Sequence, residues 1–469
     1  MQASSGAVEC AVDPARLARF VESAPRYTSY PPATEFGARF GEPEARSELA
    51  RLRGDAGAAI SLYLHVPFCS SLCWYCGCNV VATRRRERGT AYVDVLADEI
   101  ALLADAAGAG RKVVELALGG GSPNFLQPAD LERLFAAVRR GFRLGAGAEV
   151  SVELDPRDTR EEQVAALVAL GLSRISIGIQ DFDPDVQAAI HRLQSAEQTR
   201  QLVEAARRLG VERINADLVY GLPRQTPATL ARTLDEVIDL APRRVALFGY
   251  AHLPSLRPHQ RLVERAGPLP DATGRAALFA LAMERLTAAG YRMIGIDHFA
   301  RPEDELAIAA SEGRLHRNFQ GYVVRRADVL LGCGATAISD SGGAYWQNEA
   351  DLDIWQRRIA AGQLPVARGV SLHAEDRLRR QLITRLMCDG AIDFASFESA
   401  WPIRFEEHFA AELDRLAGDD YRELVEVDRA ERRIAASAAG RMFLRNLCRV
   451  FDAYQAADGA RGRRFSPSL

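Results

Sequence analysis

The sequence predicts an α/β fold: an open (β/α)6 partial barrel with an N-terminal extension and a small, mainly helical C-terminal domain. One observation is that six short apolar runs alternate with segments of helical periodicity between residues 61 and 249. Another is that helical periodicity dominates after residue 375. Right-handed crossovers make the strands of such a repeat parallel, and six strands fall short of the eight that close a barrel.

The predicted strands lie at residues 61–66, 113–118, 149–154, 174–179, 213–219 and 244–249. The helices between them lie near residues 90–106, 128–141, 159–170, 196–209 and 228–240. In such folds ligands bind at the carboxyl ends of the strands, so the polar and glycine motifs found there are site candidates.

Residues 1–55 are expected to form an extension that covers the active site. Its segment 26–32 is extended, because a residue that precedes proline avoids the helical region. Residues 56–340 are expected to form the barrel and a substrate-side extension. Residues 341–469 are expected to form the helical domain, with apolar periodicity over 375–388, 394–416 and 440–454.

Composition narrows the class of protein. The 469 residues are 48% hydrophobic, enough for one large core with appendages. The sequence contains no apolar run of membrane-spanning length and no signal peptide, so we expect no membrane span and a cytoplasmic location. A net charge of −3 gives no bulk attraction to nucleic acid, and the arginine run 84–86 is interpreted as a solvated surface.

Four of the eight cysteines fall within ten residues, which fits a metal site in a reducing compartment better than a set of disulfides. The other four are expected to be ordinary thiols: Cys10, Cys333, Cys388 and Cys448.

The cysteine cluster follows the first strand, which Pro67 ends by withholding a backbone donor. Cys69, Cys73 and Cys76 form a C-x3-C-x2-C loop. Three closely spaced thiolates suit three corners of a [4Fe-4S] cluster, whose fourth iron stays open to a substrate or cofactor. The alternative is a structural zinc site, which requires four protein ligands. Cys78 lies only two residues beyond Cys76 and is expected beside the cluster, not on it.

Several strand ends carry ligand-binding chemistry. The glycines of segment 119–122 expose backbone to a ligand. Glu153 can accept hydrogen bonds from ribose hydroxyls or an ammonium group, and Asp155 is expected to cap the following helix. Gln180 and Asp217 suit nucleoside hydroxyls, and Arg192 suits a carboxylate.

Two motifs beyond the repeat, at residues 297–302 and 316–322, combine aromatic, amide and cationic side chains. Such a mixture fits a flat apolar ring that bears carboxylates. His252 is expected to be a hydrogen-bonded loop histidine, not a metal ligand.

The C-x3-C-x2-C-x-C loop and the ordered strand-end motifs resemble the oxygen-independent coproporphyrinogen III dehydrogenase (oxidase) family of the radical S-adenosylmethionine (SAM) superfamily. The resemblance runs from about residue 26 to residue 465. It implies one [4Fe-4S] cluster, two SAM molecules and decarboxylation of two propionates of coproporphyrinogen III to vinyl groups, giving protoporphyrinogen IX in heme biosynthesis. It also implies an electron donor such as flavodoxin or ferredoxin, and a monomer.

The family's residue roles carry over position by position. Cys69, Cys73 and Cys76 would hold the cluster. The implied SAM contacts are Tyr63, Tyr75, Gly77, Cys78, Gly120, Gly121, Ser122, Glu153, Gln180, Arg192, Asp217, Ala251 and Ile338. The implied catalytic residues are Phe319, Gln320, Cys78, Tyr63 and Glu153.

Two alternatives remain: a related heme chaperone, and a non-catalytic iron-sulfur or porphyrin-binding module. Cys78, segment 26–31 and motif 316–322 count against the chaperone, whose relatives usually lack them. The chain departs from the family at residues 116–118, at Ser122 and at residues 465–467, which affects the expected substrate contacts.

Overall fold

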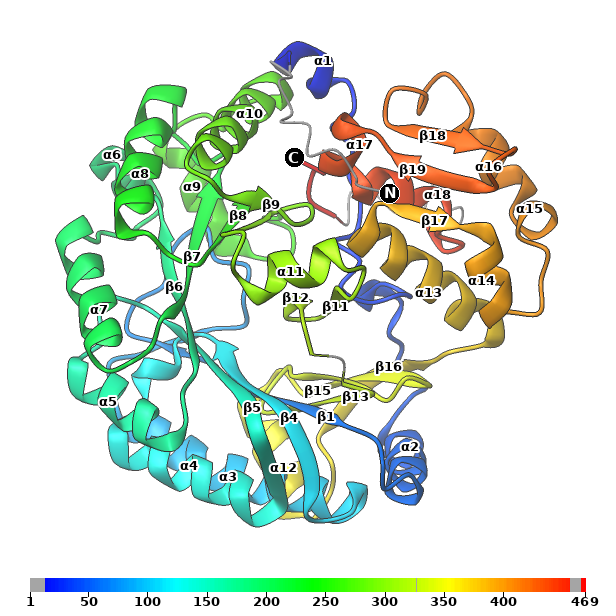
Figure 1. Cartoon of the computed structure of the whole chain (residues 1–469). Helices are drawn as coiled ribbons and strands as arrows, with labels where there is room; N and C mark the ends of the chain where they lie inside the picture. Colours follow the sequence, from blue (N-terminus) through cyan, green and yellow to red (C-terminus); the bar gives the residue numbers. More distant parts are fainter. Residues whose placement is uncertain (1–12, 326, 456–464) are drawn as a thin grey trace.

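The computed structural model describes residues 13–325, 327–455 and 465–469. Within them, twelve strands form one curved sheet whose centre is the predicted parallel repeat (Figure 1). The six repeat strands are β1 (Ile60–Val66), β4 (Arg111–Gly120), β5 (Phe142–Leu154), β6 (Arg174–Gln180), β7 (Arg213–Tyr220) and β8 (Arg244–Gly249). They pair in parallel and in this order, which confirms the predicted partial barrel.

Helices cover the outer face of this sheet (Figure 1). They are α3 (Glu87–Ala107), α4 (Pro128–Gly141), α5 (Glu161–Leu170), α7 (Ala196–Arg208), α8 (Pro227–Leu240) and α10 (Ala272–Ala288). Two short helices, α6 (Pro184–Ala189) and α9 (Arg261–Ala266), share a separate apolar cluster on which Trp74 and Tyr75 pack. Helix α4 begins with a proline at its first position, and it buries Leu131, Leu134, Phe135 and Val138 at the spacing of one helical face.

The sheet extends beyond the repeat at both edges. On one side lie β13 (Val329–Cys333), β14 (Ile338–Asp340), β15 (Ala344–Asn348) and β16 (Val366–Ser371), and on the other β10 (His298–Ala300) and β9 (Arg292–Met293). Strand β13 is parallel to β1, and the strands after it are antiparallel. The sequence predicts none of these short strands. The sheet therefore continues past residue 340, and the division of the chain at residues 55 and 340 stays a prediction.

The C-terminal part is mainly helical, as predicted, with α13 (Ala374–Asp389), α14 (Phe394–Ala400), α15 (Phe405–His408), α16 (Ala410–Leu416), α17 (Ala438–Met442) and α18 (Leu444–Val450). It also holds a small antiparallel sheet of β17 (Ala391–Asp393), β19 (Arg433–Ala436) and β18 (Val425–Asp428), which the sequence does not predict. Phe394 and Phe405 stack in its core with ring centroids 4.3 Å apart.

The remaining elements are short or peripheral: α1 (Pro14–Ala18), η1 (Ala33–Glu35), α2 (Glu42–Gly54), β2 (Phe68–Cys69), β3 (Val81–Ala82), η2 (Pro123–Phe125), η3 (Pro258–Gln260), α11 (Glu305–Ser311), β11 (His316–Asn318), β12 (Gly321–Val323) and α12 (Leu352–Ala360). None of the helices in the described ranges is long and apolar enough to cross a membrane. Cys333, Cys388 and Cys448 are buried free thiols, as expected, whereas Cys10 lies outside the described residues.

Arg445 of α18 ties both ends of the chain to the C-terminal helices. The residue is 3% exposed, and its guanidinium donates to the carbonyls of Ala24 and Pro25 and to those of Ser466 and Pro467. One planar side chain with several donors thus satisfies four backbone acceptors from segments more than 400 residues apart.

Arg445→Ala is expected to lower the free energy of unfolding by about 3 kcal/mol, because buried carbonyls lose their donors together. Chemical unfolding followed by circular dichroism measures the change. The control Arg422→Ala removes an exposed ion pair with Asp419 and should stay within about 0.5 kcal/mol of the unaltered protein. Equal losses in the two variants would contradict the role assigned to Arg445.

Candidate functional site

The cysteine loop leaves the carboxyl end of β1 and is fixed at its start by backbone pairing. Strand β2 pairs with β3, and the Phe68 carbonyl accepts a hydrogen bond from the Ser122 N–H at 2.8 Å. The short strand β2, which ends at Cys69, is therefore hydrogen-bonded both to β3 and to the glycine segment 119–122. These backbone hydrogen bonds fix the position of Cys69 relative to that segment.

Side chains from two later segments hold the middle of the loop through its carbonyl groups. His191 donates to the Leu72 carbonyl at 3.0 Å, and its ring stacks on Trp74 at 5.1 Å. The other donors come from the segment after β8 and bind the carbonyls of Tyr75, Cys76 and Gly77: Gln260 at 2.9 Å, His259 at 2.8 Å and Arg257 at 2.8 Å. The loop is thus held by the protein fold itself.

The three thiols of the C-x3-C-x2-C motif line one cavity of about 590 Å³ at the carboxyl ends of the strands. Burial and then the neighbouring cysteines raise the pKa of Cys69 to about 12, whereas a hydrogen bond from Cys78 lowers the pKa of Cys76 to about 7. In the described part of the chain, no three or more side chains of His, Cys, Asp and Glu are grouped so that they could hold a metal ion. The three thiols that line the cavity suit three corners of an iron-sulfur cluster, whereas a structural zinc site closes with four protein ligands.

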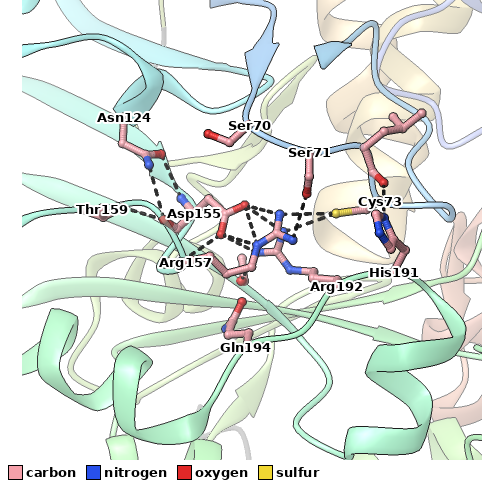
Figure 2. A network of polar contacts seen from close by, with 12 residues as sticks. Ser70, Ser71, Cys73, Asn124, Asp155, Arg157, Thr159, His191, Arg192 and Gln194 are labelled. Atoms are coloured by element: carbon pink, nitrogen blue, oxygen red, sulfur yellow. Dashed lines mark hydrogen bonds and ion pairs between the residues drawn. The ribbon is translucent and has the colours of Figure 1, made fainter. Parts of the chain in front are cut away.

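A buried network of charges lies directly beneath the loop (Figure 2). Arg192 donates to both oxygens of Asp155 at 3.0 and 3.2 Å, and Arg157 donates to the same carboxylate at 2.6 Å. Both guanidinium groups also reach the Cys73 sulfur, at 3.6 and 3.5 Å. Burial alone would raise the pKa of Asp155, but the charges of Arg192 and Arg157 lower it to about 2.

This network corrects one expectation. Asp155 does not cap the next helix, because α5 begins at Glu161 with Arg160 as its N-cap. Two buried guanidinium groups need a counterion, and the Asp155 carboxylate is the partner that they share.

Two carboxylates face the cavity from neighbouring parts of the sheet. Glu153 on β5 accepts a hydrogen bond from the Gly120 N–H at 3.1 Å, and Asp217 on β7 accepts from Ser176 at 2.7 Å and Asn215 at 2.8 Å. Burial, followed by repulsion from Asp217, raises the pKa of Glu153 to about 7. Burial also raises the pKa of Asp217. A cation or a set of hydroxyl donors in the cavity would stabilise both ionised groups.

The glycine segment is close-packed as well as open to ligands. Gly120 has a φ of +111°, and a Cβ there would collide with the His65 ring. A Cβ on Gly121 would lie 2.7 Å from the Phe68 carbonyl oxygen. The segment can therefore lie against β1 only without side chains at these two positions.

The cavity brings most of the expected site residues together. Besides the three cluster cysteines, its lining includes Tyr63, Tyr75, Gly77, Cys78, Gly120, Gly121, Ser122, Glu153, Gln180, Arg192, Asp217, Ala251 and Gln320. Phe319 and Ile338 are not part of this lining. They pack instead against the apolar cluster of Phe36, Tyr345 and Leu372, and the Phe319 ring lies 5.7 Å from that of Tyr345.

Sequence reasoning missed Arg157 and Phe248, whereas two other cavity residues, Arg26 and His298, lie in segments 26–32 and 297–302, which were expected at the active site. Arg26 donates to Asp297 at 2.8 Å and lies 5.3 Å above the Phe248 ring, although it precedes the repeat by many residues. The position of Arg157, two residues after Asp155 at the end of a strand, could have marked it as a site candidate. His252 is a hydrogen-bonded loop histidine as expected, with Tyr250 and Glu264 as partners.

Comparison with known proteins identifies the family. Residues 63–237 match the radical SAM superfamily and residues 372–443 match the HemN C-terminal domain. The oxygen-independent coproporphyrinogen III oxidase of Escherichia coli is 41% identical over 94% of this chain and 95% of its own length. The enzyme of that name from Paracoccus denitrificans is 43% identical over 94% of this chain and 96% of its own length. The chain belongs to the oxygen-independent coproporphyrinogen III oxidase family.

The solved structure of coproporphyrinogen III oxidase from Escherichia coli, described as a radical SAM enzyme, agrees with the fold at a TM-score of 0.87. It covers 92% of this chain and 97% of its own. The predicted resemblance is thereby confirmed. Membership of the coproporphyrinogen III oxidase family and of the radical SAM superfamily implies a [4Fe-4S] cluster and SAM, and the three thiols of the C-x3-C-x2-C motif line the cavity.

Replacing Cys69, Cys73 or Cys76 with alanine is expected to abolish the absorption near roughly 400 nm that sulfur-to-iron charge transfer gives, because each change removes one of three ligands. Cys78→Ala is the matched control and should keep the absorption. Iron content and the visible spectrum after anaerobic reconstitution measure both. Loss of iron in Cys78→Ala equal to that in Cys69→Ala would make Cys78 a ligand.

Proposed function

We propose that this chain catalyses the oxygen-independent oxidative decarboxylation of two propionate side chains of coproporphyrinogen III to vinyl groups, which yields protoporphyrinogen IX for heme biosynthesis. The observation that carries the proposal is the single cavity that joins the cysteine loop, the strand-end carboxylates and the polar residues beyond the repeat. Similarity to coproporphyrinogen III oxidases along nearly the whole chain supports it.

On this proposal, Cys69, Cys73 and Cys76 hold the cluster, and Glu153 and Asp217 bind polar groups of SAM. When bound, the cluster and SAM would supply the radical chemistry that starts the oxidation of a propionate side chain. The chain's own residues orient the reactants and exclude water. Tyr63 and Tyr75 line the cavity beside the loop, and burial raises the pKa of each phenol, so both stay neutral.

Two SAM molecules are proposed. The spread of the implied SAM contacts supports this number, because they reach one large cavity from several strand ends, from Tyr63 on β1 to Ala251 after β8. The unpaired Nε of Arg192 adds a buried donor for a carboxylate.

The substrate side is proposed to lie near Gln320, Arg26 and His298, which line the same cavity. The Gln320 Nε2 is buried and has no hydrogen-bond partner among the described residues, so it is available to a propionate carboxylate. The proposal further includes a monomer in the cytoplasm that receives electrons from a flavodoxin- or ferredoxin-like protein.

Reduced, cluster-loaded protein is expected to convert coproporphyrinogen III and SAM to protoporphyrinogen IX, 5'-deoxyadenosine, methionine and carbon dioxide under anaerobic conditions. Chromatography of porphyrins and nucleosides measures the products. Air should stop the reaction, since oxygen destroys an exposed cluster. Cleavage of SAM without decarboxylation, together with tight heme binding, would favour the heme chaperone.

Gln320→Ala is expected to lose most vinyl formation while keeping cluster absorption and unfolding midpoint, because the Gln320 Nε2 has no partner among the described residues. The exposed Gln363→Ala serves as the control. Unlike Gln320→Ala, Phe319→Ala should lower the free energy of unfolding by about 3 kcal/mol, because it removes a ring that packs against an apolar cluster. Unfolding of Gln320→Ala would show that its role is structural.

The affinity for SAM is expected to fall as the pH drops through about 7. Glu153 has a raised pKa and is mostly neutral below that value, and cationic SAM prefers the ionised form. The charged or titratable groups facing it are Asp217, Tyr63 and Cys78, and raised pKa values keep Tyr63 and Cys78 neutral. Anaerobic calorimetry should show about tenfold weaker binding at about pH 6 than at about pH 8.

Glu153→Gln should bind SAM more weakly and remove this pH dependence, whereas the exposed Glu204→Gln should leave the profile unchanged. A profile that stays pH-dependent in Glu153→Gln would assign the titration to another group.

A further inference from the structure

The outer side of the cysteine loop faces a surface depression that the proposed reaction leaves without a role. Ser70 and Ser71, which lie between two cluster cysteines, line it together with Arg84, Arg86, Arg157 and Asp158. Ser71 and Arg157 also line the large cavity. A single layer of side chains therefore separates the cavity that holds the thiols from this part of the surface.

Arginines dominate the segment that borders the depression. We call Arg84, Arg85, Arg86 and Arg88 the arginine surface. Arg84, Arg85 and Arg88 are exposed, and the one acidic neighbour within this run, Glu87, pairs with Arg85 at 2.7 Å. The whole chain carries a net charge of −3, so this surface has the opposite sign to the molecule. A local field of that kind orients an approaching anionic partner.

Arg86 is held in place by the protein, whereas the side chains of Arg84 and Arg88 are free to contact a partner. Arg86 donates to the Phe125 carbonyl at 2.8 Å and to Ser70 at 3.4 Å, and it lies 4.5 Å above the Phe125 ring. In the ranges that the structure describes, the Arg84 side chain has no hydrogen bond or ion pair, and the Arg88 side chain has only a ring contact with Phe68 at 5.9 Å. Neither Arg84 nor Arg88 is held by a carboxylate of the chain.

We propose that the arginine surface docks an acidic one-electron carrier protein, which reduces the cluster across the wall formed by Ser70 and Ser71. The inference rests on the proposed function, because it requires a cluster at the three cysteines. In the step the carrier is oxidised by one electron and the cluster is reduced by one electron, and no proton or group is transferred. Electron transfer slows steeply with distance, so the thin wall is the favourable place for the carrier.

The complex is of the small, short-lived kind typical of electron transfer. Its affinity comes from complementary charge, which acts mainly on the association rate and weakens with salt. An acidic protein is therefore the partner that this surface selects, and neutral or basic carriers are disfavoured by the same charges.

The test uses the full-length, cluster-loaded protein and an acidic flavodoxin with bound flavin mononucleotide. Arg84→Glu combined with Arg88→Glu reverses two exposed charges, and residue 88 lies in the first turn of α3, where an acidic side chain favours the helix. Calorimetry at low salt should show about tenfold weaker binding and a flatter salt dependence. Arg140→Glu combined with Arg143→Glu, at exposed positions next to the amino end of β5, should leave binding within about twofold.

Stopped-flow absorbance adds a second readout. The Arg84→Glu, Arg88→Glu variant should accept electrons from reduced flavodoxin about tenfold more slowly, and at the unaltered rate from dithionite, which needs no docking site. Equal flavodoxin affinity and equal reduction rates in this variant and the control variant would overturn the docking surface. Failure of the unaltered protein to decarboxylate coproporphyrinogen III even with dithionite would overturn the proposed function, and the binding result would still be interpretable.

Discussion

The Asp155 carboxylate, shared by two buried guanidinium groups, is the interaction on which the cysteine loop depends. Arg192 is 5% exposed, and removing such a charge from water costs several kcal/mol unless a partner compensates. Asp155 compensates Arg192 and Arg157 together, and both then point donors at the Cys73 sulfur. The same contact joins β5, the segment after α6 and the loop, so the positive charge beside the thiols is built into the fold.

The parallel topology explains why residues so distant in sequence meet at one site. Each crossover returns the chain to the same edge of the sheet, so Tyr63, Glu153 and Asp217 all reach one cavity from different strands. The loop itself has few internal bonds. Its carbonyls are held by His191, His259 and other side chains that come later in the chain. The geometry of the thiols is therefore a property of the whole barrel.

The sequence correctly predicted those elements whose formation depends on residues close together in the chain. Helix α4 has the predicted bounds because a proline starts it and one apolar face runs along it. Strand β13 was missed because small residues and glycines dominate around residues 332–337, and its pairing with β1 supplies what the local sequence does not. The capping role expected of Asp155 was wrong for a similar reason, since its partner Arg192 lies 37 residues away. Phe319 and Ile338 pack against the same apolar cluster, outside the cavity lining, and no spacing rule indicates this placement.

The distribution of charge about the loop connects the site with its surroundings. Inside, Glu153 and Asp217 present carboxylates, which suit a cationic cofactor and would repel an anionic protein. On the outer side, the arginine surface attracts an anionic protein and repels a cation. Arg157 lies between the two, because it lines both the cavity and the depression, and it shares the Asp155 carboxylate with Arg192. One carboxylate facing two guanidinium groups leaves a net positive charge within the wall, which has the same sign as the arginine surface and lies between that surface and the carboxylates of the cavity.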